Sequence, residues 1–129
     1  MLFKIDNKIM KFISTGLFLL IFVTSCSSQS CTGLKSFKTY REAFLKITNA
    51  TFNFTDECDF SRSSWLESGQ YYSCDGEVGY MIFTTKAGKS YIHEDLPIDV
   101  WNEFKEAESF GNFYNLNIKH IYRLVPDDE

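Results

Sequence analysis

Three residues near the middle of the chain have side chains suited to nucleophilic catalysis, namely Cys74, Asp75 and His93. A cysteine attacks as its thiolate when an imidazole within hydrogen-bond reach takes the thiol proton, and a carboxylate can orient that imidazole. The sequence cannot show whether the Cys74 sulfur lies within reach of the His93 imidazole, and Cys74 lies at a predicted turn. Because residue types without geometry are weak evidence of a catalytic site, we expect a protein without enzymatic activity.

A second cysteine, Cys26, has clearer chemistry because it follows a short apolar segment. Lys11 provides a positive start, residues 17–23 are apolar, and two small residues precede the cysteine. The apolar run is too short to cross a bilayer, so residues 1–25 are predicted to be a secretory signal peptide. Residues 23–26, Val-Thr-Ser-Cys, resemble the bacterial lipobox, in which the cysteine thiol accepts a diacylglycerol before the chain is cleaved ahead of it.

These features predict a lipid on Cys26 and a lipidated tether over residues 26–35. Two or more acyl chains would anchor the protein stably in a membrane. Ser27 is not an acidic inner-membrane retention signal, so we expect the outer membrane of the cell envelope, on its periplasmic or surface side. The membrane and an envelope macromolecule are then the expected partners. Cleavage without lipidation and an uncleaved anchor are the alternatives, and Met10 is an alternative start.

After lipidation of Cys26, three cysteines remain for an oxidising compartment, so one of them stays unpaired or bonds another molecule. We expect a disulfide between Cys58 and Cys74, because both lie beside predicted strands; buried free thiols are the alternative. The chain has no Cys-x-x-Cys motif, and His93 and His120 are far apart in sequence. The sequence therefore predicts no metal site and no cofactor.

Charge and composition limit the classes of partner. The formal net charge is −4, and it becomes −6 after residues 1–25, which hold three lysines and one aspartate. Nucleic-acid binders neutralise phosphates with clustered Lys and Arg, whereas the basic residues here are dispersed, so the charge argues against nucleic acid as a partner. Aromatic residues make up 17% of the chain, which favours a folded domain over a disordered tail.

Apolar spacing predicts the elements of this domain. Residues 36–49 have aromatic and aliphatic side chains at helical spacing, and residues 51–55 alternate as a short strand. Residues 64–73, 79–85 and 90–93 are strand-like and are separated by the turn signals Asp75-Gly76 and Ala87-Gly88. Residues 71–93 are therefore expected to form a three-stranded antiparallel meander.

The last third of the chain is predicted to be largely helical. Pro97 opens a helix with Asp95 or Leu96 at its cap, and Gly111 is expected to end it. Its buried stripe consists of Val100, Trp101, Phe104 and Ala107. Residues 113–118 are expected to form a further turn or a short helix, and residues 121–125 are expected to return to the sheet. The predicted fold class is α+β, a small antiparallel meander with helices packed on one face.

Several short segments between residues 63 and 122 carry a family resemblance, namely 63–66 (Ser-Ser-Trp-Leu), 71–72 (Tyr-Tyr), 79–83 (Gly-Tyr-Met-Ile-Phe), 88–91 (Gly-Lys-Ser-Tyr), 96–101 (Leu-Pro-Ile-Asp-Val-Trp), 107–115 (Ala-Glu-Ser-Phe-Gly-Asn-Phe-Tyr-Asn), Ile118 and Tyr122. With these segments, residues 63–122 resemble the KTSC family, named for a C-terminal extension of some lysyl-tRNA synthetases. The form found here resembles single-domain lipoproteins of the Bacteroidetes type. It implies a KTSC-like domain over residues 61–125, preceded by an N-terminal helix and strand over residues 36–60. The family's Tyr-x-Tyr motif is Tyr-Ile-His here, ending at His93.

The resemblance implies no established function, although RNA binding has been suggested for the family. We expect a non-enzymatic binding module of the envelope, with RNA binding as the alternative. Aromatic side chains with polar tips suit recognition of a partner or a glycan. The expected binding surface consists of Tyr91, His93, Tyr114, Asn115 and Lys119. The alternative roles are core packing for Tyr91 and, for Asn115, capping of a helix end or a hydrogen bond to the backbone after Gly111. Trp65 is expected in the core and His120 at the surface.

Overall fold

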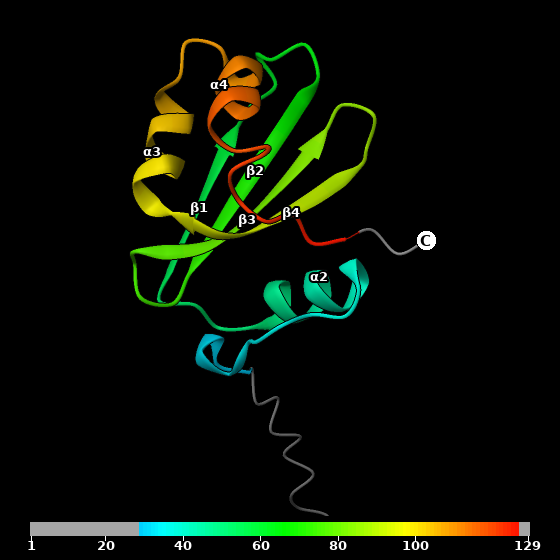
Figure 1. Ribbon diagram of the computed structural model, residues 1–129, viewed down its shortest axis with the longest axis vertical. Coiled ribbons are helices and arrows are strands. Elements are labelled where there is room, and N and C mark those ends of the chain that lie inside the picture. Colours follow the sequence, from blue (N-terminus) through cyan, green and yellow to red (C-terminus); the bar gives the residue numbers. More distant parts are fainter. Residues whose placement is uncertain (1–28, 127–129) are drawn as a thin grey trace, which may run out of the picture.

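The computed structural model describes residues 29–126 (Figure 1). The predicted signal peptide and Cys26 lie outside the described residues. The elements follow in the order η1 (Cys31–Gly33), α2 (Tyr40–Asn49), β1 (Phe54–Asp59), β2 (Leu66–Ser73), β3 (Val78–Thr85), β4 (Ser90–Pro97), α3 (Ile98–Glu106) and α4 (Phe110–Asn117), with η1 a 3-10 turn. Among residues 29–126, no helix has the length and apolar character needed to cross a bilayer.

The sheet is a four-stranded antiparallel meander with strand order β1-β2-β3-β4. It has one strand more than the predicted meander, because residues 54–59 form an edge strand that pairs with β2. The turn at Asp75-Gly76 joins β2 to β3 as expected, and Gly76 has a positive φ of 77°, a conformation that glycine adopts without steric cost.

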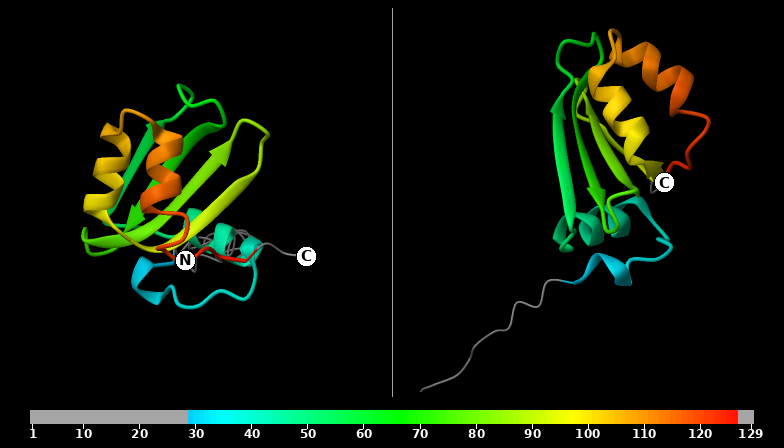
Figure 2. Two further views of the ribbon diagram at one scale, coloured as in Figure 1. Left: turned by 45° about the horizontal axis from the view of Figure 1, so that its top comes forward. Right: turned by 90° about the vertical axis from the view of Figure 1, so that its left-hand side faces the viewer.

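The helices confirm the α+β class. The side of the sheet that carries Met81 and Phe83 packs against α3 and α4, which contribute Trp101, Phe104, Phe110 and Tyr114 to the main core. Figure 2 shows α3 and α4 against this side of the strands. In addition, α2 covers part of the opposite side, where Ala43 and Ile47 pack on Ile82 and Ile92. Two small cores on opposite sides of one sheet therefore stabilise the domain.

A β-bulge in β4 determines which residues reach the main core. Between the pairs Met81–His93 and Gly79–Leu96, β4 contains one residue more than β3. Asp95 absorbs this extra residue with a φ of 55°. Because one inserted residue reverses the alternation of side chains, Leu96 points to the same side as His93 and is fully buried.

The helical region differs from the prediction at Gly111. The break between α3 and α4 falls at residues 107–109, where the Ser109 hydroxyl accepts a hydrogen bond from the Asn112 backbone N–H and caps α4. Gly111 lies inside the first turn of α4. A Cβ at this position would lie 2.7 Å from the indole Nε1 of Trp65, so the glycine is required by this close approach and not by a helix end.

Smaller differences from the prediction occur at both ends of the C-terminal helical region. Pro97 itself is the N-cap of α3, in place of Asp95 or Leu96, and Val100 and Ala107 are only partly buried. Residues 121–125 return to the sheet only through an isolated antiparallel bridge between His93 and Leu124. Two backbone hydrogen bonds accompany this bridge, from Glu94 N–H to the Arg123 carbonyl and from Val125 N–H to the Ile92 carbonyl.

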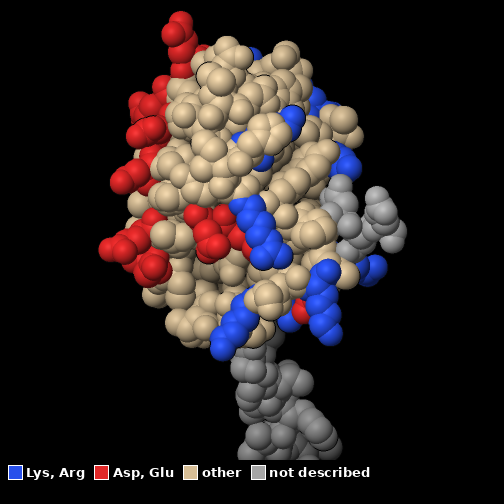
Figure 3. All heavy atoms as spheres, in the orientation of Figure 1, with Lys and Arg blue, Asp and Glu red and all other residues tan. Residues whose placement is uncertain are grey.

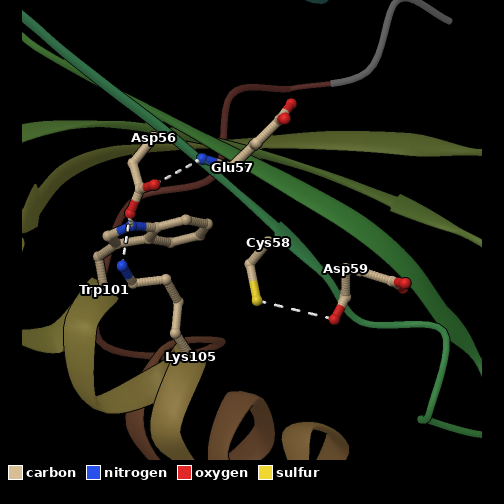
Figure 4. A network of polar contacts seen from close by, with 6 residues as sticks. All are labelled: Asp56, Glu57, Cys58, Asp59, Trp101 and Lys105. Carbon is tan, nitrogen blue, oxygen red and sulfur yellow. Dashed lines mark hydrogen bonds and ion pairs between the residues drawn. The ribbon is translucent and has the colours of Figure 1, made fainter.

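A polar network connects the edge strand β1 to α3 (Figure 4). One carboxylate oxygen of Asp56 accepts hydrogen bonds from the Trp101 indole N–H and the Lys105 ammonium group. These two donors, with Lys105 the stronger influence, lower the pKa of the Asp56 carboxyl. The network satisfies the indole of a fully buried tryptophan, so it holds α3 on the sheet at a fixed position.

The disulfide links Cys31 to Cys74, and Cys58 is a free thiol. The prediction of a Cys58–Cys74 bond was therefore wrong. Cys58 packs against the main core, close to Trp101 and Lys105 (Figure 4), and burial raises the pKa of its thiol. Cys74 lies beyond the end of β2, where the chain approaches η1. Proximity to strands was a poor guide, because the two thiols lie in different parts of the domain.

Candidate binding groove

A groove of about 450 Å³ lies between β4 and α4. Its floor is formed by strand residues of β3 and β4, and one wall by α4 and the segment after it. The lining residues are Trp65, Phe83, Thr85, Tyr91, Tyr114, Asn115, Lys119, His120 and Leu124. Apolar and aromatic groups with a few convergent polar groups are the usual composition of a ligand pocket.

Aromatic rings pack closely along the floor and wall of this groove. Phe83 and Tyr91 are cross-strand partners, and their rings stack with centroids 5.2 Å apart. Tyr114 contacts Phe83 edge-on at 4.8 Å and Trp65 at 5.5 Å. Ring pairs in these geometries are worth about 0.5–1.5 kcal/mol beyond their buried area. The rings therefore support one another and form a continuous apolar surface.

His93 lies beneath this surface and is fully buried. Its Nδ1 atom lies 3.1 Å from the Tyr122 carbonyl oxygen, and its Nε2 atom lies 3.1 Å from the Tyr114 hydroxyl. A carbonyl oxygen only accepts, so Nδ1–H is the donor to Tyr122. In the neutral ring Nε2 then accepts a hydrogen bond from the Tyr114 hydroxyl, and this bond connects β4 to α4.

The surroundings keep both side chains neutral. Burial lowers the pKa of the His93 imidazole, and its backbone contacts oppose this effect only in part. Burial likewise raises the pKa of Tyr114 to about 12. Because the pKa of His93 is lower in the folded chain than in the unfolded chain, the unfolded state takes up a proton more readily as pH falls through about 6.5. The buried, neutral His93 therefore contributes less to the free energy of unfolding in acid than at neutral pH.

Four of the five predicted binding residues line the groove, namely Tyr91, Tyr114, Asn115 and Lys119. The fifth, His93, supports the groove from below and is not a surface residue. Within residues 29–126 the side-chain amide of Asn115 has no hydrogen-bond partner, so it does not act as the helix cap that was the alternative. Tyr91 combines both suggested roles, because it stacks on Phe83 and also faces the groove.

Trp65 is a groove residue that the sequence analysis assigned to the core. It is only partly buried, and it separates the groove from a second hollow of about 270 Å³ beside the start of α4. Asn115 also borders both spaces. A tryptophan beside a predicted strand is usually a core residue. The one sequence signal for its contact with α4 is Gly111, four residues before Asn115, because a glycine lets another side chain approach the helix closely. His120, expected at the surface, is exposed and also lines the groove.

The three residues considered for nucleophilic catalysis do not form a catalytic group. The sulfur of Cys74 is bonded to Cys31, and both ring nitrogens of His93 have hydrogen-bond partners. One oxygen of Asp75 accepts hydrogen bonds from the backbone N–H groups of Glu77 and Val78 within the β2–β3 turn. Over residues 29–126, no three His, Cys, Asp or Glu side chains gather in a way that would hold a metal ion.

The fold and the groove define a small α+β domain in which a four-stranded meander carries two helices and an aromatic groove on one side. Comparison with solved structures finds a KTSC domain protein of Yersinia pestis, whose crystal structure aligns with a TM-score of 0.48 and 20% sequence identity. The alignment covers 58% of this chain and 100% of that protein's chain. No family model and no curated protein match the sequence.

Proposed function

We propose that this chain is a lipid-anchored, KTSC-like protein of the cell envelope whose groove between β4 and α4 binds an envelope macromolecule without catalysing a reaction. The observation that carries the proposal is the groove, with its closely packed aromatic rings and the polar groups of Asn115, Lys119 and His120 at its border. A ligand loses less free energy on binding when the site is already ordered.

The chemistry of the groove favours a ligand with an apolar face and a polar or anionic edge. The rings of Trp65 and Tyr91, which are only partly buried, suit the C–H face of a sugar ring or an apolar side chain. The amide of Asn115 supplies both donors and an acceptor, and Lys119 adds a positive charge in a domain that is acidic as a whole. Peptidoglycan, which combines sugars with short peptides bearing carboxylates, presents this combination of groups.

The segments that resemble the KTSC family surround this groove. Residues 63–66 supply Trp65, residues 88–91 supply Tyr91, and residues 107–115 supply Tyr114 and Asn115. These segments are far apart in the sequence but meet at one site. This convergence supports a shared binding role for the matching residues. A common binding site would explain why these separate segments resemble those of the family.

Two features support a location in the envelope. The lipobox-like segment ends at Cys26, whose thiol is the expected lipid acceptor. The Cys31–Cys74 disulfide also suits an oxidising compartment, because disulfides are rare in the reducing cytoplasm. A domain held outside the cytoplasm meets no tRNA, and the acidic surface along α3 in Figure 3 would repel nucleic acid. An envelope ligand therefore fits the protein better than RNA does.

Binding at the groove can be followed at its own tryptophan. The chain has two tryptophans, Trp65 in the groove and Trp101 in the core, so labelling with 5-fluorotryptophan gives two fluorine resonances. On titration of the lipidated chain in detergent with soluble muramidase fragments of peptidoglycan, we expect the Trp65 resonance to shift in a saturable manner and the Trp101 resonance to stay. Tyr91→Ala or Asn115→Ala should weaken binding about tenfold, equivalent to about 1.4 kcal/mol.

A matched control is Gln70→Ala, on the opposite side of the sheet from the groove. It should leave the affinity unchanged. Equal weakening by the control and the groove variants would contradict a specific role for the groove, as would a Trp101 resonance that moves with Trp65. Tight RNA binding with a steep salt dependence, in place of fragment binding, would favour the alternative function suggested for the family.

A further inference from the structure

Charge is divided unequally between the N-terminal part of the domain and the rest. Residues 29–52 contain four basic residues, Lys35, Lys38, Arg41 and Lys46, and one acidic residue, Glu42. Residues 53–126 contain twelve acidic and six basic residues. In Figure 3 the acidic side chains gather along the α3 side, and several Lys and Arg side chains gather at the end where α2 lies. One end of an acidic domain is therefore basic.

The helix at this basic end also exposes apolar side chains. Ala43 and Ile47 of α2 are fully buried against the sheet, whereas Phe44 is 36% exposed and Leu45 is 48% exposed. Arg41 is exposed one helical turn before Leu45. A helix surface that combines exposed apolar side chains with basic residues is typical of helices that lie in the interface of an anionic membrane.

The backbone around α2 holds this surface close to the predicted lipid site. Thr51, just after α2, exchanges two backbone hydrogen bonds with the chain before α2, donating to the Gln29 carbonyl and accepting from Cys31 N–H. The Cys31–Cys74 disulfide fixes the same segment to the end of β2. Gln29 lies three positions after Cys26 along the chain, a span of at most about 11 Å. A lipid on Cys26 would therefore hold α2 near the bilayer surface.

We propose that the exposed side of α2, together with Lys35 and Lys38 ahead of it, docks on an anionic lipid surface. The docked domain presents the groove away from the bilayer, because α4 and the groove lie on the other side of the sheet from α2. Phe44 and Leu45 enter the headgroup region while the lysines contact lipid phosphates. This inference rests on the lipid anchor of the proposed function for its geometry, but the surface itself binds lipid through its own side chains.

The test places a tryptophan at the predicted contact. Lipidated full-length protein carrying Leu45→Trp is reconstituted into vesicles of phosphatidylethanolamine and phosphatidylglycerol with brominated acyl chains, which quench tryptophan on contact. Relative to the wild type, whose Trp65 and Trp101 give the background emission, we expect strong quenching of the added emission in Leu45→Trp and none in Leu116→Trp, a matched control at an even more exposed leucine (77%) on α4. Phosphatidylcholine vesicles, which lack net charge, should give weak quenching at both positions.

Charge variants then measure the contribution of the lysines. In the Leu45→Trp background, Lys35→Ala with Lys38→Ala should reduce the docked population relative to the undocked one roughly 25-fold, about fivefold for each lysine. Lys86→Ala with Lys89→Ala, an equal charge change at the β3–β4 turn, should have no effect. Absence of quenching at position 45, or equal quenching at positions 45 and 116, would overturn the docking surface.

Failure of the anchor is recognised separately by intact mass, as a chain without acyl groups. Docking is then measured with the same chain added to the vesicles from solution, where the surface of α2 still predicts salt-sensitive quenching at position 45 in the anionic vesicles alone. No quenching under those conditions would overturn docking, whatever the outcome for the anchor.

Discussion

Replacing Cys31 and Cys74 with alanine is expected to lower the free energy of unfolding by about 4 kcal/mol. The bond joins residues 43 positions apart, and the chain-entropy relation for a loop of this length predicts about that loss. A domain of fewer than 100 described residues commonly has a total stability of only about 5–10 kcal/mol. The variant should therefore unfold at much lower urea concentration, and the wild type should show the same shift in a strong reductant.

Cys58→Ala is the control for this experiment. Cys58 is a partly buried free thiol, so its replacement removes little buried surface and no covalent bond. We expect a loss below about 1 kcal/mol, as for most substitutions outside a specific stabilising feature. If Cys58→Ala were as destabilising as the double replacement, or if reductant had no effect on the wild type, the Cys31–Cys74 pairing would be wrong.

His93→Leu is expected to destabilise the domain by about 3 kcal/mol. Leucine fills much of the space of the imidazole but leaves the buried Tyr114 hydroxyl and the Tyr122 carbonyl without their partner. An unsatisfied buried polar group costs about 1–3 kcal/mol. The free energy of unfolding is measured by urea titration for His93→Leu, for Tyr114→Phe and for the double variant.

The double variant separates a hydrogen bond from simple packing. Tyr114→Phe removes the hydroxyl that His93→Leu leaves unpaired, so the two losses should fall short of additivity by about 1 kcal/mol.

The pH dependence of the free energy of unfolding gives a second readout. The wild type should lose up to about 1.4 kcal/mol for each pH unit below 6.5, because the unfolded chain takes up a proton that buried His93 resists. His93→Leu should lack this component. Additive losses and an unchanged pH profile would contradict the buried hydrogen bond.

The groove shows how far the sequence could predict the site. Strand alternation places Tyr91 and His93 on one side of β4, and helical spacing places Tyr114 and Asn115 on α4. The sequence could not show that residues 118–124 fold back over the edge of β4, with Leu124 bridged to His93. These residues cover the imidazole of His93, so His93 is buried beneath the groove and not exposed at its surface as expected. A tertiary contact of this kind leaves no periodic signal in the sequence.

The disulfide pairing and the role of Gly111 could not be predicted from the sequence either, for different physical reasons. Three cysteines permit three pairings, and the choice depends on the position of η1 beneath the β2–β3 turn, which no local pattern encodes. A glycine after a helical segment usually indicates a C-cap. Here it allows α4 to approach the indole of Trp65, which lies 46 residues earlier in the chain. The apolar run of β3 and the Pro97 start of α3 gave clear local signals, and both were predicted close to their observed places.

The central claim is that the groove binds an envelope macromolecule, and photo-crosslinking in intact cells tests it most directly. A benzoylphenylalanine is placed at Leu124, which lines the groove and is 41% exposed, or at Val78, which is 40% exposed outside the groove. We predict a covalent adduct of macromolecular mass from position 124 that is lost with Asn115→Ala and is absent from position 78. No adduct from position 124, or the same adduct from both positions, would contradict the claim.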